Sequence, residues 1–239
     1  RSAVLPKVQE AIALGERLRQ SAMSHSDRVR QDGPSHVLSG HGDAANKNLD
    51  HAMYLATSDL RENRSRGRID HLMVSTRAGF DEHDVLALQS IKKLWGHGGH
   101  DLHLVLVGLG APSDFGGLSA PHTPVLGEGR VWESLTPFVP VRHPKIVRGV
   151  EVDTIPEQIA RGCEQLIGVR PVSVSPIGDS AMWQRFRRRR RDGSGRRGPD
   201  RAFGARLAFE QPVRGPIALG YGAHFGLGLF VVADEAGGG

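Results

Sequence analysis

The sequence contains a single cysteine, Cys163, among its 239 residues. One thiol excludes an internal disulfide and a zinc site made of cysteines, and it fits a reducing compartment such as the cytoplasm. Aromatic residues make up only 5% of the chain, and no apolar run approaches the roughly 20 residues that a membrane-spanning helix needs. These features predict a soluble, globular, cytoplasmic protein in which Cys163 is a small buried residue.

Several motifs of catalytic chemistry are also absent. The chain has no GxxxxGK[ST] loop for nucleotide phosphates and no GxSxG sequence for a serine nucleophile. The stretch HGGHDLH (97–103) crowds three histidines, but it has no HExxH pattern and no second carboxylate cluster at a metal-binding spacing. We therefore expect neither a cofactor nor a catalytic metal.

Charge is distributed very unevenly along the chain. The whole sequence has a formal net charge of +5, yet residues 183–206 contain ten arginines and two aspartates and so carry +8. The remaining residues therefore carry −3. Because all the excess positive charge lies in one segment, a local site for a polyanion is favoured over a generally basic surface.

The strongest electrostatic signal is WQRFRRRRRDGSGRRGPD (183–200), in which Trp183 and Phe186 are interleaved with arginines. A charge run is usually a solvated surface. Here the aromatic neighbours and the position between two predicted strands favour RNA, since the planar guanidinium binds phosphates bidentately and stacks on bases. The arginines assigned to RNA binding are Arg185, Arg187, Arg188, Arg189, Arg190 and Arg191.

Hydrophobic periodicity predicts a first α+β unit over residues 1–110. Apolar spacing favours two helices, at 6–24 and 79–96, with Asp81 as the cap of the second and Gly96 as its end. Short apolar runs predict strands at 51–58, 69–77 and 102–110. One strand supplied upstream would complete a β-α-β-β-α-β unit of the ferredoxin-like type.

A linker rich in Pro, Gly and Ser (111–127) precedes a second unit over 128–239. The predicted elements of this unit are a helix at 155–168 and strands at 131–141, 171–178, 203–210 and 225–233. The segment 211–224 takes the place of a second helix but is too rich in Gly and Pro to form a long one. The predicted fold class is therefore α+β, with two ferredoxin-like halves in tandem.

The stretch GPIALGYGAHFGLGLF (215–230) resembles the C-terminal glycine-rich loop of the RAMP superfamily, CRISPR-associated RNA-binding proteins built from ferredoxin-like folds. VWESLTPFVPVRHPK (131–145), RIDHLMV (68–74) and LPKVQEAI (5–12) are similar to one branch, the fused subunit of type I-G (I-U) CRISPR systems. The resemblance runs from Leu5 to Val231. It implies the C-terminal, RNA-processing half of that fusion, whose N-terminal half would cap the 5′ end of the guide RNA.

The resemblance implies an endoribonuclease that cuts CRISPR repeat RNA once and keeps the product within a type I interference complex. Its partners would be the repeat RNA, the mature CRISPR RNA and other subunits of that complex, with no membrane. The implied chemistry is metal-independent: the ribose 2′-hydroxyl attacks the adjacent phosphate and leaves a 2′,3′-cyclic phosphate. A catalytically silent RNA-binding subunit of the same complex is the alternative, because it needs the same glycine-rich loop and arginines.

Such a reaction needs an acid, a base and cations around the phosphate, and histidine suits both proton-transfer roles because its pKa lies near neutrality. In related processing nucleases the catalytic histidine usually follows the first helix. His51 opens the strand HAMYLA and matches a His-Ala-containing stretch of the family, so it is the first candidate. His41, in the SGHGD loop, is the second. Tyr54 is expected to face away from His51.

Further RNA contacts are predicted in two other places. Arg142, His143 and Lys145 form a compact cationic group suited to phosphate. In the glycine-rich loop, N–H groups without neighbouring Cβ atoms can approach phosphate oxygens closely. The loop glycines assigned to RNA are Gly220, Gly222, Gly226 and Gly228. His224, within this loop, is expected either to contact RNA or to complete a turn.

Overall fold

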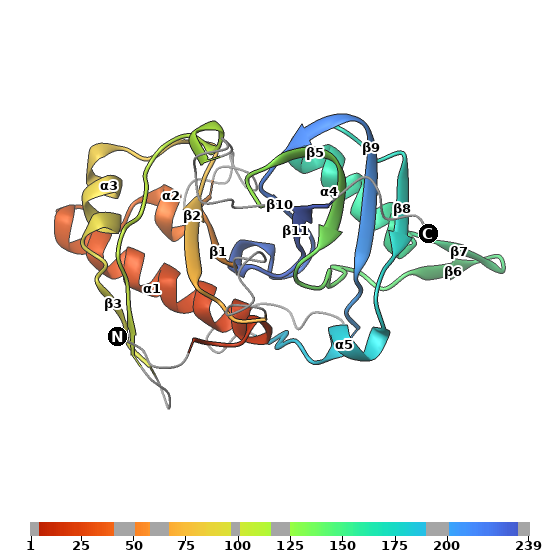
Figure 1. The fold of residues 1–239 in the computed structure, drawn as a ribbon, viewed down its shortest axis with the longest axis horizontal. Coiled ribbons are helices and arrows are strands. Elements are labelled where there is room, and N and C mark those ends of the chain that lie inside the picture. Colours follow the sequence, from red (N-terminus) through yellow and green to blue (C-terminus); the bar gives the residue numbers. More distant parts are fainter. Residues whose placement is uncertain are drawn as a thin grey trace.

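The computed structural model describes residues 5–40, 51–57, 67–96, 101–115, 125–189 and 201–233. These residues form an α+β fold of antiparallel sheets and few helices, which confirms the predicted class (Figure 1). In Figure 1 one side of the molecule holds α1, α3, β1 and β2, and the other holds the largest sheet with α4.

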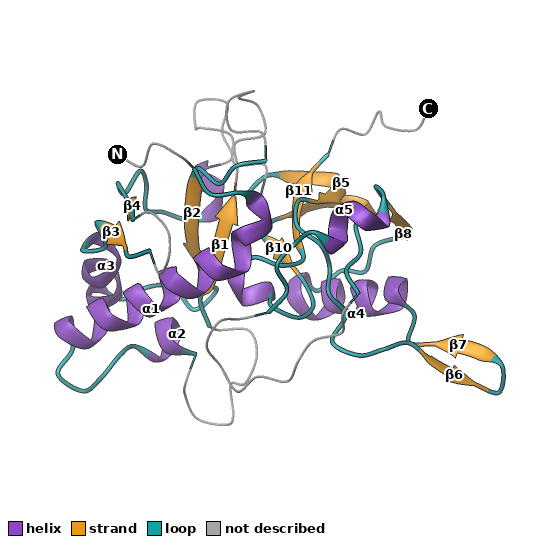
Figure 2. Cartoon of the chain, turned by 90° about the horizontal axis from the view of Figure 1, so that it is seen from below, coloured by secondary structure: helices purple, strands orange, loops and turns teal. Residues whose placement is uncertain are grey.

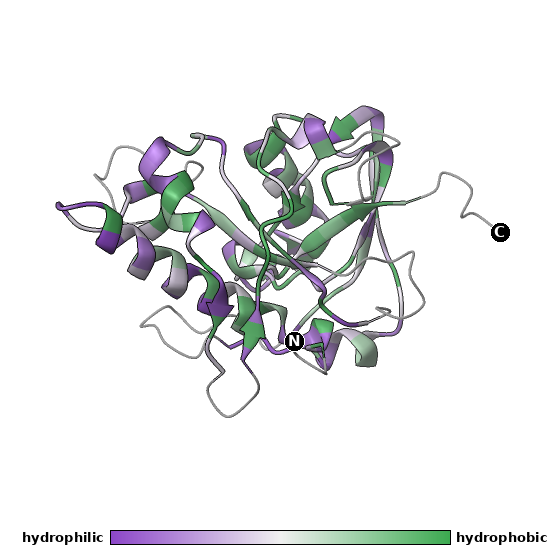
Figure 3. Cartoon of the chain, turned by 60° about the vertical axis from the view of Figure 1, so that its left-hand side comes forward, coloured by the Kyte–Doolittle hydropathy of each residue, from purple (hydrophilic) through white to green (hydrophobic). Residues whose placement is uncertain are grey.

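The first side is organised around one long helix. Its elements are η1 (Val8–Glu10), α1 (Ala11–Val29), α2 (His36–Ser39), β1 (Met53–Thr57), β2 (His71–Ser75), α3 (Glu82–Gln89), β3 (Lys93–Leu94), β4 (Leu102–His103) and η2 (Pro112–Phe115). β1 and β2 pair antiparallel, with Met53 opposite Ser75. α1 buries Ile12, Leu14 and Leu18. Hydrophilic and hydrophobic residues alternate along the helices in Figure 3, the pattern of amphipathic helices at a surface.

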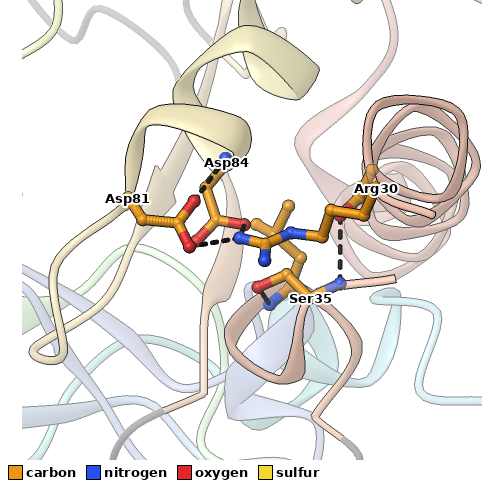
Figure 4. Close-up of polar contacts among 6 residues, drawn as sticks. Arg30, Ser35, Asp81 and Asp84 are labelled. Carbon is orange, nitrogen blue, oxygen red and sulfur yellow. Dashed lines mark hydrogen bonds and ion pairs between the residues drawn. The ribbon is translucent and has the colours of Figure 1, made fainter. Parts of the chain in front are cut away.

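A polar clamp joins the end of α1 to the start of α3 (Figure 4). The Arg30 guanidinium forms an ion pair with Asp81 and lies 3.3 Å from Oδ1 of the buried Asp84. Asp81 also caps α3, because its Oδ1 accepts from the Asp84 backbone N–H at 2.8 Å. The backbone N–H of Ser35 donates to Ser26 Oγ at 3.0 Å and folds the connection beneath the clamp.

The second side is built on a five-stranded antiparallel sheet in the order β10-β11-β5-β9-β8. Its elements are β5 (Glu128–Ser134), β6 (Lys145–Val147), β7 (Val150–Val152), α4 (Ile155–Ile167), β8 (Ser173–Pro176), α5 (Ser180–Gln184), β9 (Ala205–Arg214), β10 (Ile217–Ala218), η3 (Ala223–Phe225) and β11 (Leu229–Val232). β5 and β8 flank α4 in sequence, but β9 lies between them in the sheet. The chain therefore crosses over through α4 and skips one strand position.

The core of the second side forms where α4 covers the sheet. Thr154 and Glu157 form a reciprocal capping box at the start of α4, and Gly168 ends the helix in the left-handed conformation. Ile159 and Cys163 of α4 share a buried cluster with Trp132 of β5 and other sheet residues. Burial raises the pKa of the Cys163 thiol to about 12, so this residue is an inert part of the core.

The two sides share a core. Trp183, Phe186, Phe225 and Leu227 from the second side belong to the same buried cluster as Ile12 and the other apolar residues of α1 and β1. Burial of this apolar surface between segments far apart in the sequence holds the two sides together.

Several predicted elements are confirmed. The helix predicted at 155–168 ends at Gly168, Asp81 caps α3, and Cys163 is buried. The strands predicted at 51–58 and 69–77 correspond to β1 and β2, and those at 171–178 and 203–210 correspond to β8 and β9. The segment predicted to be too rich in Gly and Pro for a long helix contains only the three residues of η3 in helical form.

The predicted helix at 79–96 is too long. α3 ends at Gln89, and Gly96 does not end it. After Ser90 the chain turns, so that Ile91 and Leu94 are buried and Lys93–Leu94 pairs with Leu102–His103. Tertiary burial of these apolar residues overrides their helical spacing.

The predicted strand at 102–110 is present only at its start. Beyond β4 the chain runs on without a strand partner among the described residues, and Val105 and Val107 are 82% and 77% exposed. The strand predicted at 131–141 stops at Ser134, and the one predicted at 225–233 begins only at Leu229. Residues 225–228 instead form the end of the glycine-rich loop, and part of the segment 135–140 binds that loop.

Several observed elements were not predicted. α1 continues to Val29, beyond the predicted helix end at residue 24, and α2 and α5 are short helices where no helix was predicted. β6 and β7 form a two-stranded hairpin that projects from the body of the protein (Figure 2). Short elements carry too few residues for a periodic pattern, so sequence spacing gives little warning of them.

Candidate functional site

The glycine-rich loop connects β10 to β11 and folds around η3. Its four glycines, Gly220, Gly222, Gly226 and Gly228, all have positive φ, between 60° and 85°. A side chain at Gly228 would also bring its Cβ within 1.9 Å of the Leu219 carbonyl oxygen. The loop conformation therefore requires glycine, whatever else the loop binds.

The loop is bound along its length by the segment 135–140. The Thr136 hydroxyl is fully buried, donates to the Gly226 carbonyl at 2.7 Å and accepts from the Leu229 backbone N–H at 2.9 Å. The Tyr221 N–H donates to the Val139 carbonyl at 2.8 Å, and a parallel bridge joins Val139 to Gly220. The segment 135–140 and the glycine-rich loop thus form one structural unit.

The same loop packs against the first side of the molecule. η3 lies on α1 and β1. Gly15 makes this close approach possible, because a Cβ there would lie 2.6 Å from the Tyr54 carbonyl oxygen and 2.8 Å from Phe225 Cα. α1, β1 and the loop therefore meet backbone to backbone at Gly15.

This packing brings together two histidines that the sequence analysis treated separately. The ring centroids of His51 and His224 are 6.5 Å apart, with an interplanar angle of 55°. Both side chains are half-buried, so each is held by the protein and still reaches solvent. His51 precedes β1 and His224 lies in η3, so one comes from each side of the molecule.

His51 is held by its neighbours in sequence and space. The Ala52 backbone N–H donates to the Val37 carbonyl at 2.9 Å, which ties the start of β1 to α2. Gly40 ends α2 in the left-handed conformation, and a Cβ there would lie 3.7 Å from His51 Cγ. The His51 ring therefore rests against the C-terminal end of α2.

Arg19 and Tyr54 donate hydrogen bonds to carbonyl groups at the C-terminal end of α2. The Arg19 guanidinium donates to the Ser39 carbonyl, and the Tyr54 hydroxyl donates to the Leu38 carbonyl at 2.7 Å. Tyr54 is 1% exposed, and burial raises the pKa of its hydroxyl. Tyr54 is thus a core residue, whereas Arg19 adds a positive charge close to the histidines.

The environment of His224 favours the neutral imidazole. Desolvation lowers the pKa of His224 most, and the nearby His51 and Arg19 lower it further. A hydrogen bond to the Ala52 backbone acts in the opposite direction and raises the pKa. The net effect is a pKa below the ordinary histidine value of 6.5.

The described part of the arginine run follows α5 and touches the first side. The Arg187 backbone N–H donates to the Gln9 carbonyl at 3.0 Å, and its guanidinium lies 3.6 Å from the Glu10 carboxylate. Arg185, Arg187 and Arg189 are exposed, and Arg188 is half-buried. The arginine run therefore contacts η1, directly before α1, through Arg187.

The two aromatic residues of the run do not point to RNA. Trp183 and Phe186 are only 5% and 6% exposed, and the Trp183 indole N–H donates to the Ile177 carbonyl at 2.8 Å. Their presence among the arginines favours RNA on sequence grounds, but both rings lie in the core that the two sides share and so give no support to RNA binding.

The second cationic group lies at the base of the β6–β7 hairpin. Arg142, His143 and Lys145 are all exposed. Val139 pairs with Gly220 of the loop. Arg142 is three residues beyond Val139, so the chain holds Arg142 within about 10 Å of Val139.

Within the loop, the glycines differ in what they offer. Gly226 and Gly228 are buried, and their N–H groups donate to the Ala223 and Pro137 carbonyls. Gly220 and Gly222 are half-buried. Backbone contact with a phosphate is therefore more accessible at Gly220 and Gly222 than at the other two.

Some predicted site residues lie outside the described residues: His41, Arg190 and Arg191, and the first four residues of HGGHDLH. Within the described ranges, no three His, Cys, Asp or Glu side chains gather as metal ligands would. No helix in the described part of the chain is long and apolar enough to cross a bilayer. Comparisons with protein-family models, curated proteins and solved structures gave no match for this chain.

Sequence reasoning missed three residues that shape the site: Gly15, Arg19 and Thr136. Gly15 had a usable signal, since a glycine inside an amphipathic helix often marks a close backbone contact. Arg19 and Thr136 had none, because nothing in their local sequence shows that they reach segments distant in the chain.

Proposed function

We propose that this protein is a metal-independent endoribonuclease that matures CRISPR repeat RNA and retains the product within a type I interference complex. We further propose that it consists of two ferredoxin-like units in tandem. The split crossover β5-α4-β8, with β9 in the gap and β11 beside β5, supports this topology for the second unit. The succession α1, β1, β2, α3 supports it for the first.

One observation carries the proposal for function. The glycine-rich loop packs on α1 and β1, and this places His224 beside His51 at the junction of the two units. The half-buried histidines are groups able to transfer protons. The glycine backbone of the loop and the nearby Arg19 can accommodate a phosphate at close range. His51 is the group to which we assign acid–base chemistry first.

The surrounding cations support an RNA substrate. Arg187, in the run that follows α5, lies 3.6 Å from the Glu10 carboxylate directly before α1. Arg19 lies nine residues beyond Glu10, about 14 Å further along the helical axis at the α-helical rise. Arg142, His143 and Lys145 follow Val139, which pairs with Gly220 of the loop. These residues and the arginines after α5 offer two groups of cations to the phosphates of an RNA strand.

The experiment that tests this function is cleavage of the protein's own repeat RNA with and without EDTA. We expect one cut in the repeat, unaffected by EDTA, that leaves a 2′,3′-cyclic phosphate and a 5′-hydroxyl. His51→Ala is expected to abolish cutting while RNA affinity stays within a few-fold, because one imidazole contributes little to binding.

Two outcomes would contradict the proposal in different ways. Loss of cleavage in EDTA, restored by magnesium, would replace the mechanism with a metal-dependent one. Tight RNA binding without any cut would favour the alternative, a catalytically silent RNA-binding subunit.

A further inference from the structure

We propose that His51 and His224 form a two-histidine catalytic site for an RNA phosphodiester, with His224 as the general base and His51 as the general acid. This inference rests on the proposed endoribonuclease function and adds to it a second catalytic group from the glycine-rich loop. It starts from the contact between the two units, where the ring centroids lie 6.5 Å apart.

The separation suits a phosphate held between the rings. In an in-line displacement the attacking and leaving oxygens lie on opposite sides of phosphorus, and each catalytic nitrogen must come within about 3 Å of its oxygen. Two rings in direct contact would leave no room for the phosphate, and rings much further apart would not reach both oxygens. The interplanar angle of 55° shows that the two rings are not stacked face to face.

The hydrogen bond to Ala52 uses one ring nitrogen of His224. The Ala52 N–H already donates to the Val37 carbonyl, so the contact with His224 uses the Ala52 carbonyl, which can only accept. The imidazole therefore donates through one ring nitrogen, and in the neutral ring the other nitrogen carries a free lone pair. A lone pair fixed in this way is what a general base requires.

The charged and titratable groups that face His224 keep it neutral. They are Arg19 on α1 and His51 before β1. Desolvation, His51 and Arg19 all lower the pKa of His224 from its ordinary value. A neutral His224 can accept a proton, and His51, whose ring centroid lies 6.5 Å away, is the group to which we assign the role of acid.

The reaction balances with these two groups alone. His224 takes the proton of the 2′-hydroxyl as the 2′-oxygen forms its bond to phosphorus. The bond from phosphorus to the 5′-oxygen breaks, and His51 gives its proton to that oxygen. The products are a 2′,3′-cyclic phosphate and a 5′-hydroxyl, and proton exchange with water restores both histidines. The positive charge of Arg19 favours the negative charge on the phosphate during the step.

A merely structural role for His224 makes a different prediction. If its only task is to donate to the Ala52 carbonyl, then His224→Gln, which keeps an N–H donor, will retain activity. A glutamine amide is not a base, so a catalytic His224 predicts that His224→Gln loses activity as fully as His224→Ala. General acid–base groups contribute roughly 10²–10⁴-fold to rate, which sets the size of the expected loss.

The experiment measures single-turnover cleavage of the repeat RNA from pH 5 to 9, with RNA affinity and thermal melting as separate readouts. The variants are His224→Gln, His224→Ala and, as a matched control, His83→Gln on the exposed side of α3. We expect a bell-shaped profile for the wild type. His224→Gln should cut at least roughly 100-fold more slowly and lose the acidic limb, with affinity within a few-fold. Added imidazole should partly restore His224→Ala, with the acidic limb at the pKa of free imidazole.

The outcomes separate this inference from the proposed function. A wild type that binds the RNA but never cuts it overturns both. An active wild type whose His224→Gln variant keeps the same rate and pH profile overturns the two-histidine site and leaves the endoribonuclease intact, with His51 paired to another group. A His224→Ala variant that imidazole does not restore, with RNA binding unchanged, contradicts the role of base.

Discussion

At the scale of single residues, Gly15 shows how one missing side chain positions the site. Glycine in a helix normally costs about 0.5–1 kcal/mol relative to alanine. Here the sign is reversed, because a Cβ would meet backbone atoms, the Tyr54 oxygen at 2.6 Å and Phe225 Cα at 2.8 Å. Backbone on both sides cannot move aside as a flexible side chain can, so the contact between α1, β1 and η3 depends on this glycine.

We therefore predict that Gly15→Ala destabilises the protein by roughly 1–3 kcal/mol, the usual range for overpacking. The matched control is Gly162→Ala in α4, where the nearest atom is the end of the Leu219 side chain at 3.3 Å. Its stability should stay within about 1 kcal/mol of the wild type, since that side chain can give way. Urea unfolding of the three proteins measures both effects. A Gly15→Ala variant more stable than the wild type would show that α1 does not press on η3.

At the scale of elements, the clamp of Arg30 with Asp81 and Asp84 fixes the angle between α1 and α3 (Figure 4). The Asp84 backbone N–H lowers the pKa of the Asp81 carboxyl most, and the Arg30 guanidinium lowers it further. A carboxyl whose pKa is lowered by folding stabilises the protein above its unfolded pKa. That stability is lost as the pH falls through the lower, folded value.

We predict that Asp81→Asn reduces the loss of stability in acid. Asparagine keeps a side-chain oxygen for the cap of α3 but carries no charge, so the ion pair and the proton linkage disappear together. The unfolding free energy of the wild type should fall more steeply than that of the variant as the pH decreases from about 4 toward 2. Denaturant titrations at pH 7, 4 and 2.5 provide the comparison. Parallel curves for the two proteins would mean that this carboxyl is equally acidic in the folded and unfolded chains.

At the scale of the whole molecule, opposite charges are separated into different regions. Residues 183–206 carry +8 and the rest of the chain −3. Arg187 of this segment contacts η1, directly before α1, so the segment lies against the first side of the molecule. For the RNA substrate proposed above, long-range attraction would draw the RNA backbone toward this segment before any specific contact forms.

We predict that replacing Arg187–Arg191 with serine flattens the dependence of log affinity on log salt by roughly 0.7 for each lost phosphate contact on single-stranded RNA. RNA affinity at moderate salt should fall roughly tenfold or more. Arg170→Ser is the control, because Arg170 pairs with Glu164 on the exposed side of α4, and its salt dependence should match the wild type. RNA titrations at several salt concentrations, with a thermal melt of each variant, make the measurement. An unchanged slope and melt for the serine variant would mean that the run is only a solvated loop.

The sequence alone determined the features that depend on near neighbours. Asp81 and Gly168 mark helix ends through bonds that span three or four residues, so local spacing was enough to find them. The excess positive charge of 183–206 is likewise a property of the sequence. The individual candidates, His51 and His224, came from local patterns and the family resemblance.

Only the tertiary structure decided which of these residues meet. His224 lies beside His51 because the loop packs on α1 and β1, and that packing depends on Gly15 and Thr136, whose distant partners no local pattern reveals. Trp183 and Phe186 are in the core and not on the surface for the same reason. Long-range burial is a property of the whole chain, because the free energy gained by removing apolar surface from water depends on what each residue packs against.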